Sequence, residues 1–572
     1  MFAVTSTAVS AAEVHSDGVG DTLTIGDFIF TVLDDGTAKV TRYIGNDADV
    51  VIPSNLGGYE VTVIGKKAFY YLSVESITFP NTVITIEEES IYSCDNLKTI
   101  IISESIKYLD ANFYDSGSFE KYIVDINNPY YYSEDGVLFN KDMTVLLDYP
   151  LAKKDSFYRV PKSVETIKDI CSYNLDYLEI TENVSKIETD TLAKSYLYDI
   201  TVAEDNSYFS SEDGVLFNKD KTRLIRFPHK KEITSYTVPD SVYRIWDYAF
   251  NMSKLNHITL NDGLKYINQH AFEGACLYDL VIPDSVIEVG EYAFRNMDYC
   301  TEITLSENLT IIKPYTFNGC TELLKVDIPD KITSIGEWAF RACISLTEVN
   351  FSDELICIGA MAFDRCRSLT KANIPEKVTS IEEWAFRDCS GLTEMSLPDG
   401  MTSIGEGVFL GCSSLEKVNV PQGLTIIDWQ VFQDCELITE VTIPSNVSII
   451  SGNAFAGCTS LEKVIIPSSV TKIYGDAFLN CEALTIYGFL NTAAHTYAVE
   501  NNIPFVAMIM GDVNFDGVVN IIDATEIQKA VSGITSFSEE STQVADVNGD
   551  GVVNISDATM IQKYCVGLAE II

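Results

Sequence analysis

Apolar residues recur along most of the chain at a spacing of 22 or 23 residues. The clearest marker of this spacing is a column of phenylalanines, which comprises Phe250, Phe272, Phe294, Phe317, Phe340, Phe363, Phe386, Phe409, Phe432, Phe455 and Phe478. A fixed period of this length is typical of stacked units, none of which can bury its apolar face alone. The pattern therefore predicts a solenoid with one continuous core.

One repeat, Ser368–Gly391, shows how each unit is built. Leu369, Ala372 and Ile374 alternate with polar residues, which predicts a short strand with one buried face. Pro375 ends this strand because proline has no amide hydrogen to donate to a neighbouring strand. A second short apolar segment follows, and the repeat phenylalanine then enters the core. The expected fold is a right-handed, β-rich solenoid of the leucine-rich-repeat type.

These repeats resemble the BspA-like leucine-rich repeats of bacterial surface proteins. The motifs Ile-Pro-x-x-Val, Ile-Gly-x-x-Ala-Phe and Phe-x-x-Cys-x-x-Leu carry the resemblance across residues 51–483, and they are best kept after residue 240. An open stack exposes apolar edges, so both ends need a cap. We expect an N-terminal hairpin cap at 20–50 and a C-terminal cap at 484–510.

A decapeptide, SEDGVLFNKD, occurs twice in the less regular half, at Ser133–Asp142 and Ser211–Asp220. An Asp-Gly pair between apolar runs favours a tight hairpin turn. We therefore expect two copies of a β-hairpin insertion, near 126–150 and 204–228, that project from the stack.

The C-terminal part of the chain repeats a pattern of 22 residues, at Asp512–Gly533 and Asp546–Gly567, with 16 identical positions. Each copy places side-chain oxygens at alternating positions of a loop that has glycine at its sixth position. Calcium prefers such clusters of oxygen ligands. We predict two calcium ions, although an acidic solvated turn is the alternative. The candidate ligands, in which valine offers its backbone carbonyl, are Asp512, Asn514, Asp516, Val518, Asn520 and Asp523, and then Asp546, Asn548, Asp550, Val552, Asn554 and Asp557.

Two features distinguish these loops from an ordinary EF-hand. The twelfth position is Asp rather than Glu, and no helix is expected before the first loop. With these features, residues 511–572 resemble a type I dockerin, a small all-α module with two loop–helix halves. The resemblance implies calcium-dependent binding to a cohesin module of a scaffold protein, as in a cellulosome, with two possible docking orientations.

The family's recognition positions can be carried over to this chain. They are Ile521, Ile522, Gln528, Lys529, Ile555, Ser556, Gln562 and Lys563. The Ser-Thr pair of some dockerins is absent here, so the choice of cohesin can differ. Alternatively, Ile521 and Ile555 are simply core residues of the module. Because the module is short and acidic, we expect bound metal to supply much of its folding energy.

A second candidate surface lies two residues before each repeat phenylalanine. Large residues occupy this position in seven successive turns: Tyr248, His270, Tyr292, Tyr315, Trp338, Met361 and Trp384. We expect this position to face outward or to lie at an edge. The stripe could stack sugar rings or anchor a protein partner, or its rings could merely cover the loop of the next turn. A polar column on the strand face is a solvated surface or a further candidate, and comprises Asp327, Asn350, Asn373, Ser396, Asn419 and Thr442.

The chain contains 14 cysteines, and eight of them follow a repeat phenylalanine by three residues, from Cys320 to Cys481. One thiol per turn, pointing inward, favours a reduced structural ladder over disulfides. Metal binding at the thiols is disfavoured because no Cys-x-x-Cys pair or partner histidine occurs.

The net charge of −44 and the pI of about 4.3 argue against nucleic acid and anionic membranes as partners. No apolar run is long enough for a membrane-spanning helix. Residues 1–19 resemble the remnant of a secretory signal peptide, with a disordered tail as the alternative.

No catalytic motif emerges from the sequence. The five histidines are scattered, and no nucleophile elbow, zinc motif or phosphate loop occurs. We therefore expect a non-catalytic, secreted subunit that docks onto a cellulosome-type scaffold, with the solenoid as an adhesion surface for polysaccharide or a cell-surface protein. The alternatives are a cellulosomal polysaccharide hydrolase with an unrecognised site, which would place the chain in polysaccharide catabolism, and a purely structural spacer.

Overall fold

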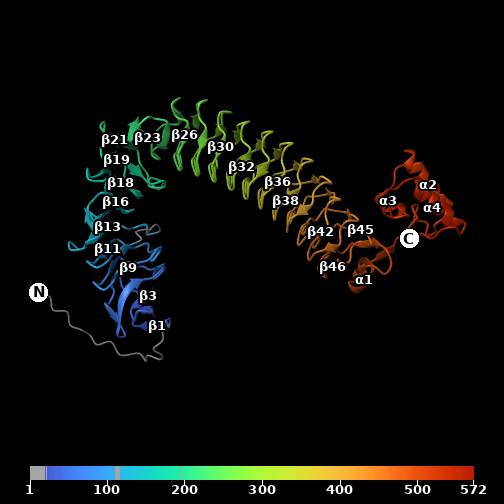
Figure 1. Ribbon diagram of the computed structural model, residues 1–572, viewed down its shortest axis with the longest axis horizontal. Coiled ribbons are helices and arrows are strands. Elements are labelled where there is room, and N and C mark those ends of the chain that lie inside the picture. The colour runs from blue at the N-terminus through green and yellow to red at the C-terminus, as the bar shows by residue number, and fades with distance from the viewer. Residues whose placement is uncertain (1–19, 21, 110–115, 194, 572) are drawn as a thin grey trace. The chain divides into compact units, whose positions relative to one another are not determined.

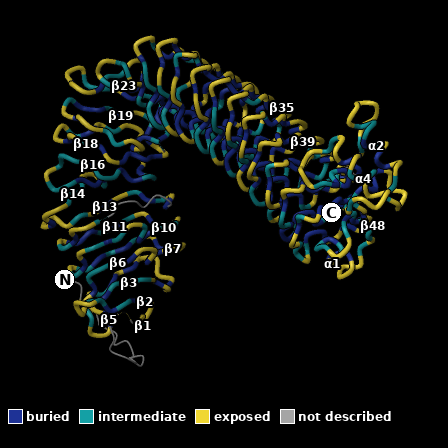
Figure 2. Tube along the Cα trace, turned by 45° about the vertical axis from the view of Figure 1, so that its right-hand side comes forward, coloured by how far each residue is buried: buried dark blue, intermediate teal, exposed yellow. Residues whose placement is uncertain are grey.

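The structure is a computed structural model that describes residue 20 and residues 22–109, 116–193 and 195–571. The signal-peptide prediction for residues 1–19 lies outside this range. The chain divides into two units (Figure 1). Unit 1 comprises Met1–Ile233 and Ser241–Lys254, and unit 2 comprises Thr234–Asp240 and Leu255–Ile572. In both units, buried residues line the inside of each turn and exposed residues lie at its bends (Figure 2).

Unit 1 begins with an antiparallel meander of β1 (Thr22–Ile25), β2 (Phe28–Val32) and β3 (Ala38–Tyr43). β3 pairs in parallel with β6 (Tyr59–Ile64), which also forms an antiparallel pair with β5 (Asn55–Leu56). Residues such as Phe30 and Val40 are fully buried, so the meander closes this end of the core.

Parallel strands then build the first turns of unit 1. One sheet contains β4 (Asp49–Val51), β8 (Ser76–Thr78), β11 (Thr99–Ile102) and β13 (Lys121–Val124). The facing strands are β6, β9 (Thr85–Ile86) and β12 (Tyr108–Leu109), and β7 (Phe69–Tyr70) pairs with β10 (Ile91–Tyr92) at the bend.

The duplicated decapeptides form antiparallel hairpins, but the expectation that they project from the stack is wrong. In the first copy, Val137, Leu138 and Phe139 are all fully buried. Leu138 belongs to one core cluster, and its two neighbours belong to the next. Three consecutive apolar residues suit a strand that is buried on both faces. The hairpins are therefore built into the stack.

Each hairpin continues into a third strand that replaces a repeat strand. The copies are β14 (Tyr131–Glu134), β15 (Val137–Asn140) and β16 (Val145–Asp148), and β22 (Phe209–Glu212), β23 (Val215–Asn218) and β24 (Arg223–Arg226). The third strands pair in parallel with β18 (Thr166–Ile167) and β26 (Arg244–Ile245), respectively. The remaining strands of unit 1 are β17 (Phe157–Arg159), β19 (Tyr177–Ile180), β20 (Lys186–Ile187) and β21 (Asp199–Val202).

Unit 2 is a more regular stack in which most turns have a three-residue strand, a two-residue strand and a bend (Figure 1). In β29 to β39 and in β43, the middle residue of the longer strand is buried, as Ala372 is in β37. The longer strands are β25 (Ser235–Thr237), β27 (His257–Thr259), β29 (Asp279–Val281), β31 (Glu302–Thr304), β33 (Lys325–Asp327), β35 (Glu348–Asn350), β37 (Lys371–Asn373), β39 (Glu394–Ser396), β41 (Lys417–Val418), β43 (Glu440–Thr442) and β45 (Lys463–Ile466). The shorter strands are β28 (Tyr266–Ile267), β30 (Glu288–Val289), β32 (Ile311–Ile312), β34 (Ser334–Ile335), β36 (Cys357–Ile358), β38 (Ser380–Ile381), β40 (Ser403–Ile404), β42 (Ile426–Ile427), β44 (Ile449–Ile450) and β46 (Lys472–Ile473).

The repeat phenylalanines form a continuous stack of rings inside unit 2. Phe363, for example, lies 5.2 Å from the ring centroids of both Phe340 and Phe386, with interplanar angles of 5° and 8°. The bend around each ring before Phe478 is tight, because the residues two before and two after the ring have positive φ, as at Trp338 (59°) and Ala342 (60°). Amides of the bend donate to the bend of the next turn, so the stack continues there without regular strands.

The eight repeat cysteines lie beside this ring stack. Each Sγ donates to the backbone oxygen of the phenylalanine in the preceding turn, as Cys389 does to Phe363 at 3.1 Å. All 14 cysteines are free thiols. Burial raises the pKa of the Cys343 thiol to about 12, so the protonated form that donates is favoured. The column is a ladder of reduced thiols bonded to backbone rather than to one another.

A cap and a small helical module complete unit 2. β47 (Thr485–Gly488), α1 (Ala493–Glu500) and β48 (Phe505–Ala507) form the cap, and the Tyr497 ring meets the last repeat phenylalanine at 5.8 Å. The module contains α2 (Ile521–Val531), α3 (Glu539–Ala545) and α4 (Ile555–Cys565). Its core also includes Ile465 of the stack. The sequence did not predict α3.

Candidate functional site

Two buried carboxylates organise the first loop of the C-terminal module. The amides of Asp516 and Gly517 donate to the two carboxylate oxygens of Asp512 at 3.1 and 2.9 Å. The amide of Val513 donates to Asp523 at 3.0 Å. Gly517 has a φ of 85°, which a side chain would strain. These bonds wrap the loop around its first and twelfth residues.

The other candidate ligands of this loop also hold its backbone in place. The side-chain oxygen of Asn514 accepts from the amide of Asp516 at 2.9 Å, and Asp516 accepts from the amide of Val518 at 3.0 Å. Asn520 then donates from its side chain to the Val518 carbonyl at 2.9 Å. Carboxylate, amide and carbonyl oxygens are thus brought into one small loop.

The second loop repeats this arrangement. The amides of Asp550 and Gly551 donate to Asp546 at 3.2 and 2.8 Å. Asp557 accepts from the amides of Asn548 and Asn554 at 3.3 and 2.8 Å. The remaining candidates, Asp550 and Val552 among them, are bonded as in the first loop.

The twelfth loop residue also caps the following helix. Asn520 is the N-cap of α2, and Asp523 accepts from its amide at 2.8 Å in a capping box. Asn554 and Asp557 form the same box at α4. The loop chemistry therefore fixes where each helix starts, which places the exposed residues of its first turn.

Each loop offers a mixed set of carboxylate, side-chain amide and backbone carbonyl oxygens, and such a set suits a calcium ion. In the part of the chain that the structure describes, no three Asp, Glu, His or Cys side chains converge to hold a metal. Asparagine and backbone oxygens must therefore complete each set, as they do for calcium. Burial raises the pKa of the Asp523 carboxyl, and a bound cation would offset that cost of desolvating its charge.

The predicted docking residues lie at the start and along the length of α2 and α4. Ile521, Ile522 and Ile555 are 53%, 52% and 54% exposed, so the alternative that Ile521 and Ile555 are core residues is wrong. Ser556 and Lys563 are exposed as well, whereas Gln528, Lys529 and Gln562 are half-buried. The core of the module is instead made by residues such as Ile527 and Ile561, which are fully buried.

The aromatic column of the solenoid is half-buried rather than open to solvent. All seven residues, Tyr248, His270, Tyr292, Tyr315, Trp338, Met361 and Trp384, have intermediate exposure and positive φ. In unit 2, the Tyr292 ring stacks on its neighbours His270 and Tyr315 at 4.6 and 4.4 Å, with interplanar angles of 7° and 17°. Arg341 lies over the Trp338 ring at 4.4 Å. Because neighbouring side chains already cover these ring faces, the geometry favours the alternative that the rings cover the adjacent turn.

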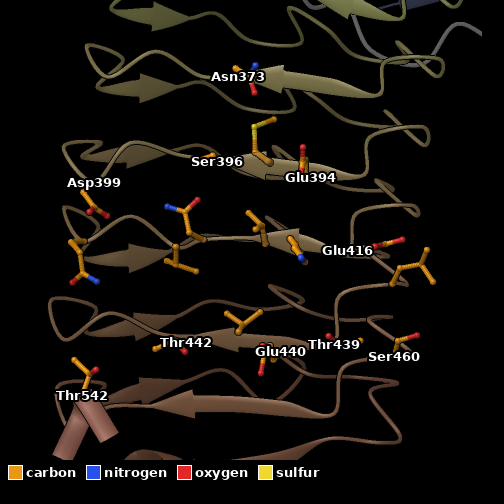
Figure 3. Close-up of a pocket in the computed structure, with 18 of the residues that line it drawn as sticks. Asn373, Glu394, Ser396, Asp399, Glu416, Thr439, Glu440, Thr442, Ser460 and Thr542 are labelled. Carbon is orange, nitrogen blue, oxygen red and sulfur yellow. The ribbon is translucent and has the colours of Figure 1, made fainter. Parts of the chain in front are cut away.

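A polar groove of about 1000 Å³ lies on the strand face of unit 2 (Figure 3). It includes Asn373, Ser396, Asn419 and Thr442 of the predicted polar column. Sequence reasoning missed the other side chains, which come from the first strand positions, the turns before and after the strands, and α3. They include Glu394, Asp399, Glu416, Lys417, Thr439, Glu440, Ser460 and Thr542. The only signal for them in the sequence is the position of each in the repeat.

Two protein-family models match the chain. The family model of the BspA type Leucine rich repeat region matches residues 50–142, 225–347, 310–439 and 356–485, more than half of the chain. The chain belongs to the BspA-type leucine-rich repeat family. The Dockerin type I domain model matches residues 510–565. The predicted architecture of BspA-type repeats followed by a type I dockerin is therefore confirmed.

Several solved structures are similar to this BspA-type chain. A leucine-rich repeat protein from Eubacterium ventriosum is 21% identical, with 64% of this chain and 95% of that chain covered and a TM-score of 0.44. One from Bacteroides ovatus is 19% identical, with 85% and 100% covered and a TM-score of 0.40. A leucine rich cell surface protein from Faecalibacterium prausnitzii is 20% identical, with 85% and 99% covered and a TM-score of 0.28. No curated protein matches the chain.

The dockerin match indicates a metal ion and a protein partner. Type I dockerin domains generally bind calcium, and a dockerin implies docking onto a cohesin in a cellulosome-like complex. None of the helices among the described residues is long and apolar enough to span a membrane.

Proposed function

We propose that this BspA-type chain is a non-catalytic, secreted subunit that its dockerin attaches to a cohesin-bearing scaffold, while its solenoid binds polysaccharide. The observation that carries the proposal is the dockerin itself: two loops with matching oxygen ligands, each leading into a helix with exposed apolar residues. A secreted location is consistent with this module and with a similar structure that is described as a cell surface protein.

Two calcium ions would complete the dockerin, one in each loop. Asp512, Asn514, Asp516, Val518, Asn520 and Asp523 would hold the first ion, and Asp546, Asn548, Asp550, Val552, Asn554 and Asp557 would hold the second. When bound, each ion supplies positive charge that neutralises the clustered carboxylates and links the loop to the start of its helix. The exposed helix residues would then be held in one arrangement.

The docking surface would run along α2 and α4 from their first turns. The apolar Ile521, Ile522 and Ile555 are about half exposed, and exposed apolar side chains are costly unless a partner covers them. Ser556, Gln528, Lys529, Gln562 and Lys563 would surround them with hydrogen-bond donors and acceptors. Since both helices carry related residues, either half could face the cohesin.

Calorimetric titration with a type I cohesin tests this surface. Changing Ile521 and Ile522 to Asp should leave docking through α4. Changing Ile555 and Ser556 to Asp should leave docking through α2. The variant with all four changes should not dock. Val531→Asp serves as the control because Val531 is 45% exposed at the other end of α2. Undiminished docking by the fourfold variant would refute the assignment.

The solenoid is proposed to bind polysaccharide without cleaving it. Its regular polar strand face and the polar groove support a binding role, and no sequence motif of a hydrolase supports catalysis. The test incubates the calcium-loaded chain with insoluble plant cell-wall polysaccharides and measures both retained protein and released reducing sugar. Retention without release is expected. Release that is lost on mutating a carboxylate pair would establish the hydrolase alternative instead.

A further inference from the structure

The groove on the strand face lies where the pairing of the solenoid strands is interrupted. β41 is the last strand of one sheet, and β43 belongs to the next. The side chain of Asn419, just after β41, donates to the Leu397 carbonyl and accepts from the Leu397 amide, both at 2.7 Å. The Asn419 side chain thus makes the hydrogen bonds to Leu397 that the backbone of a longer β41 would make. The sheet surface opens between β41 and β43, and Figure 3 shows polar side chains from both sides of this opening.

The charge of the groove excludes one class of ligand. Among the described residues that line it, four carry carboxylates, Glu394, Asp399, Glu416 and Glu440, and a single one, Lys417, carries an ammonium group. Polyanions such as uronate polymers or nucleic acids would meet net repulsion there.

The ammonium of Lys417 is available to a ligand. The first positions of the longer strands alternate between Glu and Lys along the stack, so Lys417 lies between Glu394 and Glu440. Glu394, however, pairs with Lys371 at 3.1 Å, and Glu440 pairs with Lys463 at 3.8 Å. Among the described residues, no carboxylate lies within 4.0 Å of the Lys417 ammonium. It remains a donor in the middle of the groove.

The composition of the groove also disfavours a protein partner. No aromatic or arginine side chain is among the described residues that line it. The centres of protein interfaces are enriched in tyrosine, tryptophan and arginine and poor in aspartate, glutamate and serine. Most of the described residues that line this groove instead carry carboxylates, amides or hydroxyls, beside a smaller apolar set that includes the exposed Leu437.

Such a set of groups suits a ligand that is uncharged and rich in hydroxyls. A planar carboxylate or amide can bond two adjacent hydroxyl groups of a sugar at once, and an ammonium donates to hydroxyl and ring oxygens. The polar column from Asn373 to Asn419 crosses three paired strands, which at about 4.8 Å per step gives a length of about 10 Å, and it continues across the opening to Thr442. One step is close to the length that one β-linked sugar residue adds to an extended chain.

We propose that this groove binds a short segment of a neutral glycan chain that runs along the stack. The proposal rests on the proposed function of the solenoid as a polysaccharide-binding surface, and it places the contact in the groove rather than on the aromatic column. Thr542 of α3 lines one end of the groove (Figure 3), so the bound segment would lie next to the dockerin.

Titration calorimetry of the full chain in calcium tests this site, with cellohexaose, xylohexaose and mannohexaose as neutral probes and hexagalacturonate as the anionic probe. The groove variant combines Glu394→Ala and Ser396→Ala, at the first and third positions of β39. The matched control combines Glu348→Ala and Asn350→Ala, at the same positions of β35 and outside the groove lining. Hydrogen exchange in the substituted turns that matches the parent shows that each variant is folded there.

We expect at least one neutral probe to bind the parent, the groove variant to bind it about tenfold or more weakly, and the control to bind it within about twofold. If parent, variant and control bind equally, the groove assignment fails while the polysaccharide function stands. If the parent binds only hexagalacturonate, the assignment fails on charge. If the parent binds no probe and no insoluble polysaccharide, the proposed function of the solenoid fails with it.

Discussion

Replacing Asp364 by Asn tests whether a buried charge cluster holds the middle of unit 2 together. Asp364 is fully buried one residue after a repeat phenylalanine. It accepts hydrogen bonds from Nε of Arg341 at 2.9 Å and from Nε and Nη2 of Arg387 at 2.8 and 3.1 Å. Its carboxylate thus joins three successive turns, and it raises the pKa of the Arg387 guanidinium.

The magnitude follows from the burial of the three partners. Removing one partner of a fully buried ion pair costs about 3–5 kcal/mol. The two arginine side chains are each 23% exposed, so water can partly replace the lost carboxylate. We therefore expect Asp364→Asn to cost about 2–3 kcal/mol. A surface ion pair would cost about 0–1 kcal/mol.

Hydrogen-exchange mass spectrometry is the suitable assay, because turns of a solenoid unfold locally and depend mainly on their neighbours. A loss of this size corresponds to exchange about 30- to 150-fold faster in the turns around Phe340, Phe363 and Phe386. Asp388→Asn is the matched control, since Asp388 is 44% exposed and lies 3.8 Å from Arg365. Equal exchange in the Asp364 and Asp388 variants would refute the reasoning.

Three further predictions concern pH, thiol reactivity and charge pairing. Burial raises the pKa of the Asp148 carboxyl well above its usual value. Unit 1 therefore loses stability as pH rises above about 4, where this carboxyl ionises in the unfolded chain but not in the folded one. Asp148→Asn should raise the melting temperature at pH 8 and have no effect near pH 3. The exposed Cys565 should react with a thiol reagent in the native chain, whereas the repeat cysteines should react only after denaturation. Lys371→Glu would place like charges opposite Glu348 and Glu394 and should destabilise this region by about 0.2–1 kcal/mol per pair, less at high salt.

Each of these predictions has a result that contradicts it. A melting difference between parent and Asp148→Asn that is constant with pH would show that the carboxyl is not held protonated. Fast labelling of several thiols in the native state would mean that the cysteine ladder is open. No change on Lys371→Glu, at either salt concentration, would mean that the alternating charges do not interact.

The sequence was sufficient to predict the structure wherever a side chain of one type has one structural role. The repeat phenylalanine and the cysteine three residues later predicted the solenoid and its buried thiols, because each sits at a fixed place in a rigid turn. The calcium loops were equally readable, since Gly517 and the alternating oxygens have few other uses.

The aromatic column was harder to predict because its constraint lies in the backbone. Trp338 and Tyr292 occupy the left-handed region, which their side chains do not indicate. Gly407 and Asn453 at the same position do indicate it, since glycine and asparagine adopt this conformation readily. If all residues at this repeat position share the backbone conformation that Gly407 and Asn453 favour, a tight bend with half-buried rings is expected.

The hairpins and the groove depend on contacts that a single sequence does not reveal. Val137–Phe139 is apolar at three consecutive positions, a pattern that fits a doubly buried strand as well as a projecting hairpin. The groove arises from the interrupted pairing beside Asn419, whose side chain replaces backbone bonds. Nothing in the type of residue 419 distinguishes an asparagine that bonds the backbone of the next strand from one that bonds only solvent.

The measurement that tests the account most directly is the affinity of the full chain for a type I cohesin, with calcium and after chelation, beside a variant with Asp512→Ala and Asp546→Ala. The account predicts tight binding by the parent in calcium, loss of binding on chelation that is restored by adding calcium, and no binding by the variant. Docking that persists after chelation, or that the variant retains, would contradict a calcium-dependent dockerin as the basis of this protein's function.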